Sequence, residues 1–133
     1  MNRVLVVDDE DDVRSLVHDI LTGNGYEVFA AASGEEGLDK AVSLKPDLII
    51  LDVVMPGLSG IEVCRLVKSK PSLQHVRVLV LSALDRDVDR QLIESARADG
   101  YLRKPFSVHD LLSKVDELSR ERKGATQRPD HKK

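Results

Sequence analysis

Acidic, hydroxyl and ammonium side chains follow the apolar runs of this sequence, at the point where each run ends. Asp8 and Asp9 follow the first run, Asp52 follows the unbroken run 48–51, and Ser82 and Lys104 follow two later runs. If these runs are parallel strands, their carboxyl ends share one edge of a sheet, where ligands of such folds bind. A lone aspartate at a strand end is more often a solvated residue, but four such ends together predict a site.

The residue types at this edge indicate phosphoryl transfer. Three carboxylates close together repel one another, so the site requires a cation. Oxygen ligands suit Mg²⁺ or Mn²⁺, and the four histidines of the chain have no metal-ligand spacing. A metal-held carboxylate can attack phosphorus as the nucleophile, while the metal and a lysine stabilise charge on the transferred group.

The elements that position these residues alternate between strands and helices. Strands are predicted at 3–8, 26–31, 48–52, 76–81 and 100–103, and helices at 11–22, 33–45, 61–70, 85–97 and 107–118. This alternation predicts an α/β domain with a parallel sheet and helices on both faces. The inward faces of four helices are predicted from apolar spacing: Val13, Leu16, Val17, Ile20 and Leu21; Leu38, Ala41 and Val42; Val88, Leu92, Ile93 and Ala96; and Val108, Leu111, Leu112, Val115 and Leu118.

The composition is that of one soluble domain. The 133 residues are 41% hydrophobic and 32% charged, and no apolar run approaches the ~20 residues of a membrane span. The sequence begins without a signal peptide, and it contains a single cysteine, Cys64, which we expect to be buried on a helix. Both features predict a cytoplasmic protein. We expect a domain at 1–120 and a basic, disordered tail at 121–133. The acidic body argues against direct nucleic-acid binding.

The chain resembles the receiver domain of two-component response regulators over roughly residues 3–118. The motifs that carry the resemblance are Val-Val-Asp8-Asp9-Glu, Leu-Asp52-Val-Val-Met-Pro-Gly-Leu-Ser-Gly, Leu-Ser82-Ala and Tyr101-Leu-Arg-Lys104-Pro105-Phe. The resemblance implies a flavodoxin-like, doubly wound (βα)5 fold with a five-stranded parallel sheet of order 2-1-3-4-5. It also implies that Asp52 accepts a phosphoryl group from a sensor histidine kinase.

The resemblance further implies a Mg²⁺ site, with Mn²⁺ as a possible substitute. Asp9, Asp52 and the backbone carbonyl of Val54 hold the ion directly, and Asp8 reaches it through water. Such a domain catalyses only its own phosphorylation and dephosphorylation, so it is not an enzyme in the ordinary sense.

A switch is implied as well. Lys104 contacts the phosphoryl group, Ser82 moves toward it, and Tyr101 turns inward. The surface of the fourth helix, fifth strand and fifth helix then changes and controls a downstream target protein. The peptide bond between Lys104 and Pro105 is expected to be cis.

Two departures from the family pattern carry expectations. Arg97 stands where most relatives have glycine; if that helix end needs a positive φ, arginine costs about 1 kcal/mol, and otherwise the helix ends differently. Val54 and Leu84 flank the site where many relatives have polar residues. Neither side chain can orient an attacking water, so we expect a long-lived phosphoryl state.

Several alternatives stay open at this point. The chain could be a stand-alone receiver, a phosphorelay intermediate or a receiver fragment of a longer regulator, and it could be a monomer or a phosphorylation-dependent homodimer. A pseudo-receiver would lack an acid or the lysine, and neither is missing here. A phosphatase with an aspartyl phosphate would need a general acid at Val54, which cannot donate a proton.

Overall fold

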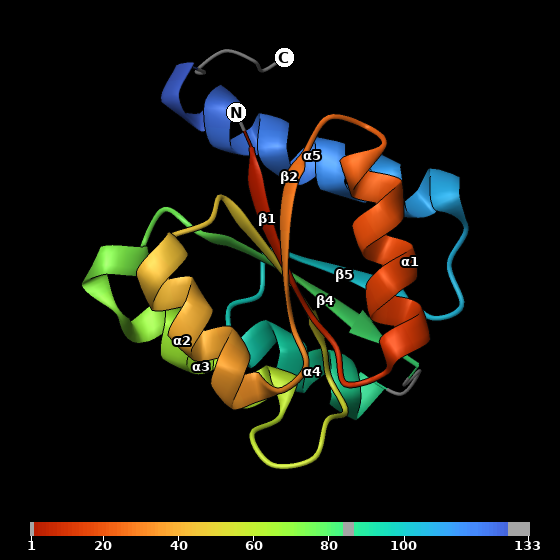
Figure 1. The fold of residues 1–133 in the computed structure, drawn as a ribbon. Helices are drawn as coiled ribbons and strands as arrows, with labels where there is room; N and C mark the ends of the chain where they lie inside the picture. The colour runs from red at the N-terminus through yellow and green to blue at the C-terminus, as the bar shows by residue number, and fades with distance from the viewer. Residues whose placement is uncertain (1, 84–86, 128–133) are drawn as a thin grey trace.

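Five parallel strands form the centre of the molecule (Figure 1). The computed structural model describes residues 2–83 and 87–127. The strand order is β2-β1-β3-β4-β5, which confirms the predicted fold class. The strands are β1 (Arg3–Val7), β2 (Glu27–Ala31), β3 (Leu48–Asp52), β4 (Arg77–Ser82) and β5 (Gly100–Arg103).

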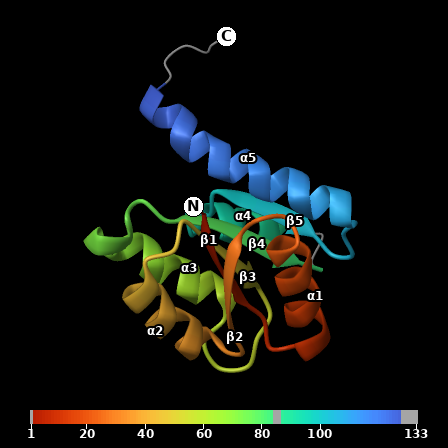
Figure 2. The same cartoon turned by 45° about the horizontal axis from the view of Figure 1, so that its top comes forward.

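Helices cover both faces of this sheet. On one face lie α1 (Asp11–Thr22) and α5 (Val108–Gln127), and on the other lie α2 (Gly34–Leu44), α3 (Gly60–Ser69) and α4 (Asp87–Ser95) (Figures 1 and 2). A short 3₁₀ helix, Pro71–Leu73, follows α3. None of the helices in the described ranges is long and apolar enough to cross a bilayer.

The strands supply apolar side chains to two cores, one on each face of the sheet. Val4 and Val6 point to the core beneath α1 and α5, whereas Leu5 and Val7 point to the core beneath α2, α3 and α4. All five residues of β3 are buried because helices cover both of its faces. Cys64 is fully buried in the second core, as predicted, and burial raises the pKa of its thiol to about 11.

Four residues predicted to face inward are exposed instead. Leu16 is 52% exposed, and Val42, Leu92 and Val108 are also largely exposed. In three cases the next or preceding residue along the helix (Val17, Ala41, Ile93) takes the buried position. Successive residues lie 100° apart around a helix, and each helix here contacts the sheet along a narrow stripe, so only one of each pair reaches the core. The side chain of Val88 lies outside the described part of the chain.

Helix α5 is longer than the sequence predicts. It runs to Gln127 and therefore enters the segment 121–133 that we expected to be a disordered tail; residues 128–133 lie outside the described ranges. Figure 2 shows that its C-terminal part projects past the sheet. Arginine, glutamate and lysine are good helix formers, so the helix continues beyond Leu118, which is buried.

The end of α4 has the backbone conformation that favours glycine. Arg97 has φ of +66°. Of the two possibilities given for this residue, the structure therefore has the one in which the helix end requires a positive φ. Its guanidinium donates a hydrogen bond of 3.2 Å to the carbonyl of Lys68 on α3. The helix end thus keeps a left-handed residue although the side chain is not glycine, and the side chain ties α4 to its neighbour.

Candidate functional site

The strand order brings the predicted site residues to one edge of the sheet. β3 lies between β1 and β4, and β5 lies on the far side of β4. Asp8 follows the last residue of β1, Asp52 is the last residue of β3, and Ser82 is the last residue of β4. Lys104 follows β5, and its backbone N–H donates to the Ser82 carbonyl at 2.8 Å. The peptide bond from Lys104 to Pro105 is cis, as expected.

The ammonium group of Lys104 is the centre of the site. Its Nζ atom lies 3.3 Å from Oδ1 of Asp52, 3.5 Å from Oδ2 of Asp8 and 3.7 Å from Oε1 of Glu10. Three acids therefore surround one cation. The arrangement leaves negative charge uncompensated, which favours binding of a further cation.

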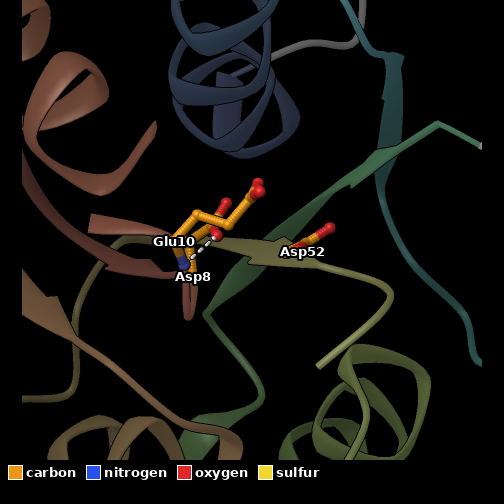
Figure 3. Close-up of side chains that lie close together, drawn as sticks. All are labelled: Asp8, Glu10 and Asp52. Atoms are coloured by element: carbon orange, nitrogen blue, oxygen red, sulfur yellow. Dashed lines mark hydrogen bonds between the residues drawn. The ribbon is translucent and has the colours of Figure 1, made fainter. Parts of the chain in front are cut away.

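The acids form a group of the kind that holds a divalent ion. Carboxylate oxygens of Asp8, Glu10 and Asp52 lie within 4.8 Å of one another, and the side chains extend into the same space from the ends of β1 and β3 (Figure 3). An all-oxygen donor set with excess negative charge fits Mg²⁺. Asp9 is exposed and is not a member of this group among the described residues.

Burial sets the electrostatics of the acids. The side chains of Asp8 and Asp52 are only 1% and 9% exposed. Burial raises the pKa of Asp8, against the lowering effect of the Glu10 backbone N–H and of Lys104. Burial and, after it, the charge of Asp8 raise the pKa of Asp52, while Lys104 and the Val54 backbone N–H lower it. Burial opposes the charge of Lys104, but Asp52 and Asp8 raise the pKa of the ammonium group.

The loop after Asp52 is fixed by backbone contacts. The Val53 N–H donates to the Leu81 carbonyl at 3.0 Å, and the Gly60 N–H donates to the Val53 carbonyl at 3.1 Å. A Cβ atom on Gly60 would lie 2.1 Å from the Asp52 carbonyl oxygen, so no other residue fits there without moving the strand end. Gly57 has φ of +75°, as its place after Pro56 predicts.

Two residues at the site were not identified from the sequence. The Glu10 carboxylate joins the acidic group, and the Glu10 N–H donates to Asp8 Oδ1 at 2.9 Å. Arg14 of α1 donates to the backbone carbonyl of Asp8 at 2.8 Å and so holds the turn after β1. The signal for Glu10 is its spacing, because side chains two residues apart on an extended segment point to the same side.

The two predicted switch residues lie on neighbouring strands. Ser82 is buried at the end of β4. Tyr101 on β5 is half-buried, packs against the core beneath α4, and has the Arg90 guanidinium 6.0 Å from its ring centre. It also lines a cavity of about 240 Å³ together with residues of α4 and the turn after it.

Sequence comparison places the chain among proteins of one family. Residues 4–116 match the response regulator receiver domain. The chain is 41% identical over 118 residues to the alkaline phosphatase synthesis transcriptional regulatory protein PhoP of Bacillus subtilis, covering 89% of this chain and 48% of PhoP. It is 43% identical over 121 residues to the response regulator MprA of Mycobacterium avium, covering 91% of this chain and 52% of MprA. The chain thus spans about half the length of these relatives.

Solved structures of the same kind superpose closely. The chemotaxis protein CheY4 of Vibrio cholerae is 35% identical with a TM-score of 0.85, over 89% of this chain and 98% of CheY4. The response regulator TrrA of Thermotoga maritima, solved in complex with Mg²⁺ and a beryllium fluoride, is 38% identical with a TM-score of 0.79, over 89% of this chain and 99% of TrrA.

Proposed function

Because the chain belongs to the response regulator receiver domain family, we propose that Asp52 accepts a phosphoryl group from a sensor histidine kinase in a reaction that requires Mg²⁺. One observation carries the proposal: Asp52 is a buried carboxylate at a strand end, 3.3 Å from the ammonium group of Lys104 and beside two other acids. A nucleophile, a cation and metal ligands are the parts that phosphoryl transfer uses.

In this reaction an Asp52 oxygen forms a bond to phosphorus while the bond from phosphorus to the kinase histidine nitrogen breaks. The electron pair of that bond returns to the imidazole. Lys104 contacts the phosphoryl oxygens and stabilises their charge. A Mg²⁺ ion held by the acids would supply further positive charge to the transferred group.

We assign the metal to Asp9, Asp52 and the Val54 carbonyl, with Asp8 acting through water. The likeness to TrrA, whose structure contains Mg²⁺, supports the binding of this metal. The acidic group in the present structure supports a metal at this edge of the sheet but includes Glu10 and not Asp9. The assignment of Asp9 therefore requires its exposed side chain to turn toward the ion.

The proposed output is a change on the α4-β5-α5 surface that a target protein reads. Ser82 moves toward the phosphoryl group and Tyr101 turns inward. The cavity beside Tyr101 supports this, because it gives the α4-β5 contact room to rearrange. The proposed location of the protein is the cytoplasm, where it would interact with the kinase histidine and the target protein.

Three roles are proposed for the whole protein: a stand-alone receiver, a phosphorelay intermediate and a receiver fragment of a longer regulator. The chain spans about half the length of its relatives, which is consistent with the third role. PhoP is named as a transcriptional regulatory protein, so the relatives give no support to the expectation that nucleic acid is not bound. An aspartyl-phosphate hydrolase is disfavoured, because Val54 stands where a general acid would be needed.

The test is incubation with acetyl phosphate, with and without Mg²⁺, followed by intact-mass measurement. We expect one phosphoryl adduct that requires the metal and that Asp52→Asn abolishes. Asp39→Asn, which removes an exposed acid on α2, is the matched control and should still be labelled. An adduct that forms without metal or survives in Asp52→Asn, or steady turnover of phosphate esters, would reject the proposal.

A further inference from the structure

The side chain of Glu10 serves the site and not the helix that follows it. Glu10 stands at the N-cap position of α1, yet its side chain makes no capping hydrogen bond within the described chain. Its carboxylate lies instead 3.7 Å from the ammonium group of Lys104, while remaining 62% exposed. Figure 3 shows the side chain extending from the end of β1 into the space shared with Asp52.

The three acids around Lys104 differ in how solvent reaches them. Asp8 and Asp52 are buried, so they line the inner part of the site, whereas Glu10 lies at its opening. An incoming phosphoryl group needs the same ammonium for its own oxygens. Glu10 therefore places a negative charge at the opening through which a negatively charged donor enters. The same carboxylate lies beside the Lys104 ammonium group, which the donor must contact.

We propose that Glu10 is a specificity-determining residue, one that disfavours small, freely diffusing phosphoryl donors of high negative charge relative to a donor carried by a docked protein. This rests on the proposed function of Asp52. A small dianionic donor binds only through its phosphoryl group, so it has no other contacts to offset the repulsion from the Glu10 carboxylate. A phosphohistidine on a protein gains binding energy from contacts elsewhere, and that energy can offset the charge at the opening.

The chemical step itself does not use Glu10. With acetyl phosphate, an Asp52 oxygen bonds to phosphorus as the bond from phosphorus to the acetyl oxygen breaks, and acetate leaves with the electron pair. Glu10 acts on the approach of the donor. Glu10 should therefore change the second-order rate constant measured at low donor concentration. The size of this change should depend on the charge of the donor and on the salt concentration.

The first measurement is the rate of adduct formation by intact mass at saturating Mg²⁺. Relative to the unmodified chain, Glu10→Gln should react with acetyl phosphate about threefold to tenfold faster, the effect of one removed charge at the opening of a solvated site. Phosphoramidate, which carries one fewer net negative charge, should show a smaller gain. The gain should shrink between about 0.01 M and 1 M ionic strength, because the screening length falls from about 30 Å to about 3 Å.

The second measurement is Mg²⁺ affinity without any donor, by calorimetry. Removing a carboxylate from the acidic group should weaken Mg²⁺ binding, so the two readouts move in opposite directions. A merely structural role would lower both. Glu10→Ala should repeat the pattern, circular dichroism verifies the fold of each variant, and Asp39→Asn, which removes the same charge at a distance, should change neither readout.

The outcomes separate this inference from the function on which it rests. If the unmodified chain forms no Mg²⁺-dependent adduct, both fail. If it forms the adduct but Glu10→Gln is no faster at saturating metal, or if its gain persists at high salt, only the role of Glu10 fails. An Mg²⁺ affinity that is unchanged or higher in Glu10→Gln would also overturn the placement of its charge beside the ion.

Discussion

The carboxylates of Asp8 and Asp52 are both buried and lie close together, and burial and then the charge of Asp8 raise the pKa of the Asp52 carboxyl above its usual 3.8. The folded protein therefore favours the neutral, protonated form of the Asp52 carboxyl more than water does. Lys104 compensates part of this charge, since it contacts both acids.

Asp52→Asn should stabilise the metal-free protein at pH 7 by about 1 kcal/mol. An acid with a raised folded-state pKa binds its proton more tightly when folded, so its contribution to stability is present below the unfolded value and is lost as pH rises through the raised value. Asparagine avoids that loss. Urea unfolding in chelator should show the gain at pH 7 and a smaller gain near pH 4; a variant less stable at pH 7 would contradict it.

Asp9→Asn should weaken Mg²⁺ binding by about tenfold on the proposed assignment of Asp9 as a direct ligand, because an amide lacks the charge that a carboxylate contributes. Asp9 is exposed and outside the acidic group, so its loss should leave the metal-free stability unchanged. Calorimetric titration with Mg²⁺ measures the first quantity and thermal unfolding in chelator the second. An unaltered Mg²⁺ affinity would remove Asp9 from the ligand set.

Val54→Asn should shorten the lifetime of the phosphoryl group by about threefold to tenfold, since an amide can orient a water for attack and an isopropyl group cannot. The Val54 side chain is 64% exposed beside Asp52, so an amide there has access to solvent. Leu84, the other flanking residue, lies outside the described part of the chain. Loss of the adduct after donor removal, followed by mass, gives the rate; equal lifetimes would count against the expectation.

Arg97→Gly should raise the free energy of unfolding by about 0.5–1 kcal/mol, because glycine adopts φ of +66° without the steric cost that arginine has. The hydrogen bond to the Lys68 carbonyl is lost, but it is exposed and contributes little. Arg97→Val provides the opposite comparison and should destabilise. Urea midpoints that fall for glycine would show that the contact with Lys68 outweighs the backbone strain.

Much of the site was predictable because its residues mark the ends of apolar runs. Asp52, Ser82 and Lys104 lie where the sequence places them, since parallel strands share one direction and their ends share one edge. Predicting that Lys104 lies beside the two buried acids required knowledge of the strand order. The strand order followed from the family resemblance and not from the periodicity of apolar residues.

The choice among consecutive acids was not predictable from residue types. Asp8, Asp9 and Glu10 are all acidic, and which of them lies close to Asp52 depends on the backbone at the strand end. Glu10 has φ of −89° and ψ of 118°, an extended conformation that puts its side chain on the same side as Asp8. The exposure of Leu16 has a similar origin, because apolar spacing does not tell where along the sheet a helix rests.

Gly60 has no functional group, yet its lack of a side chain lets the chain turn directly beneath the Asp52 carbonyl. Even alanine at this position would push the backbone of the proposed nucleophile out of line while leaving every charge of the site in place. A genetic screen for chains that no longer accept a phosphoryl group should therefore recover position 60 alongside the acids.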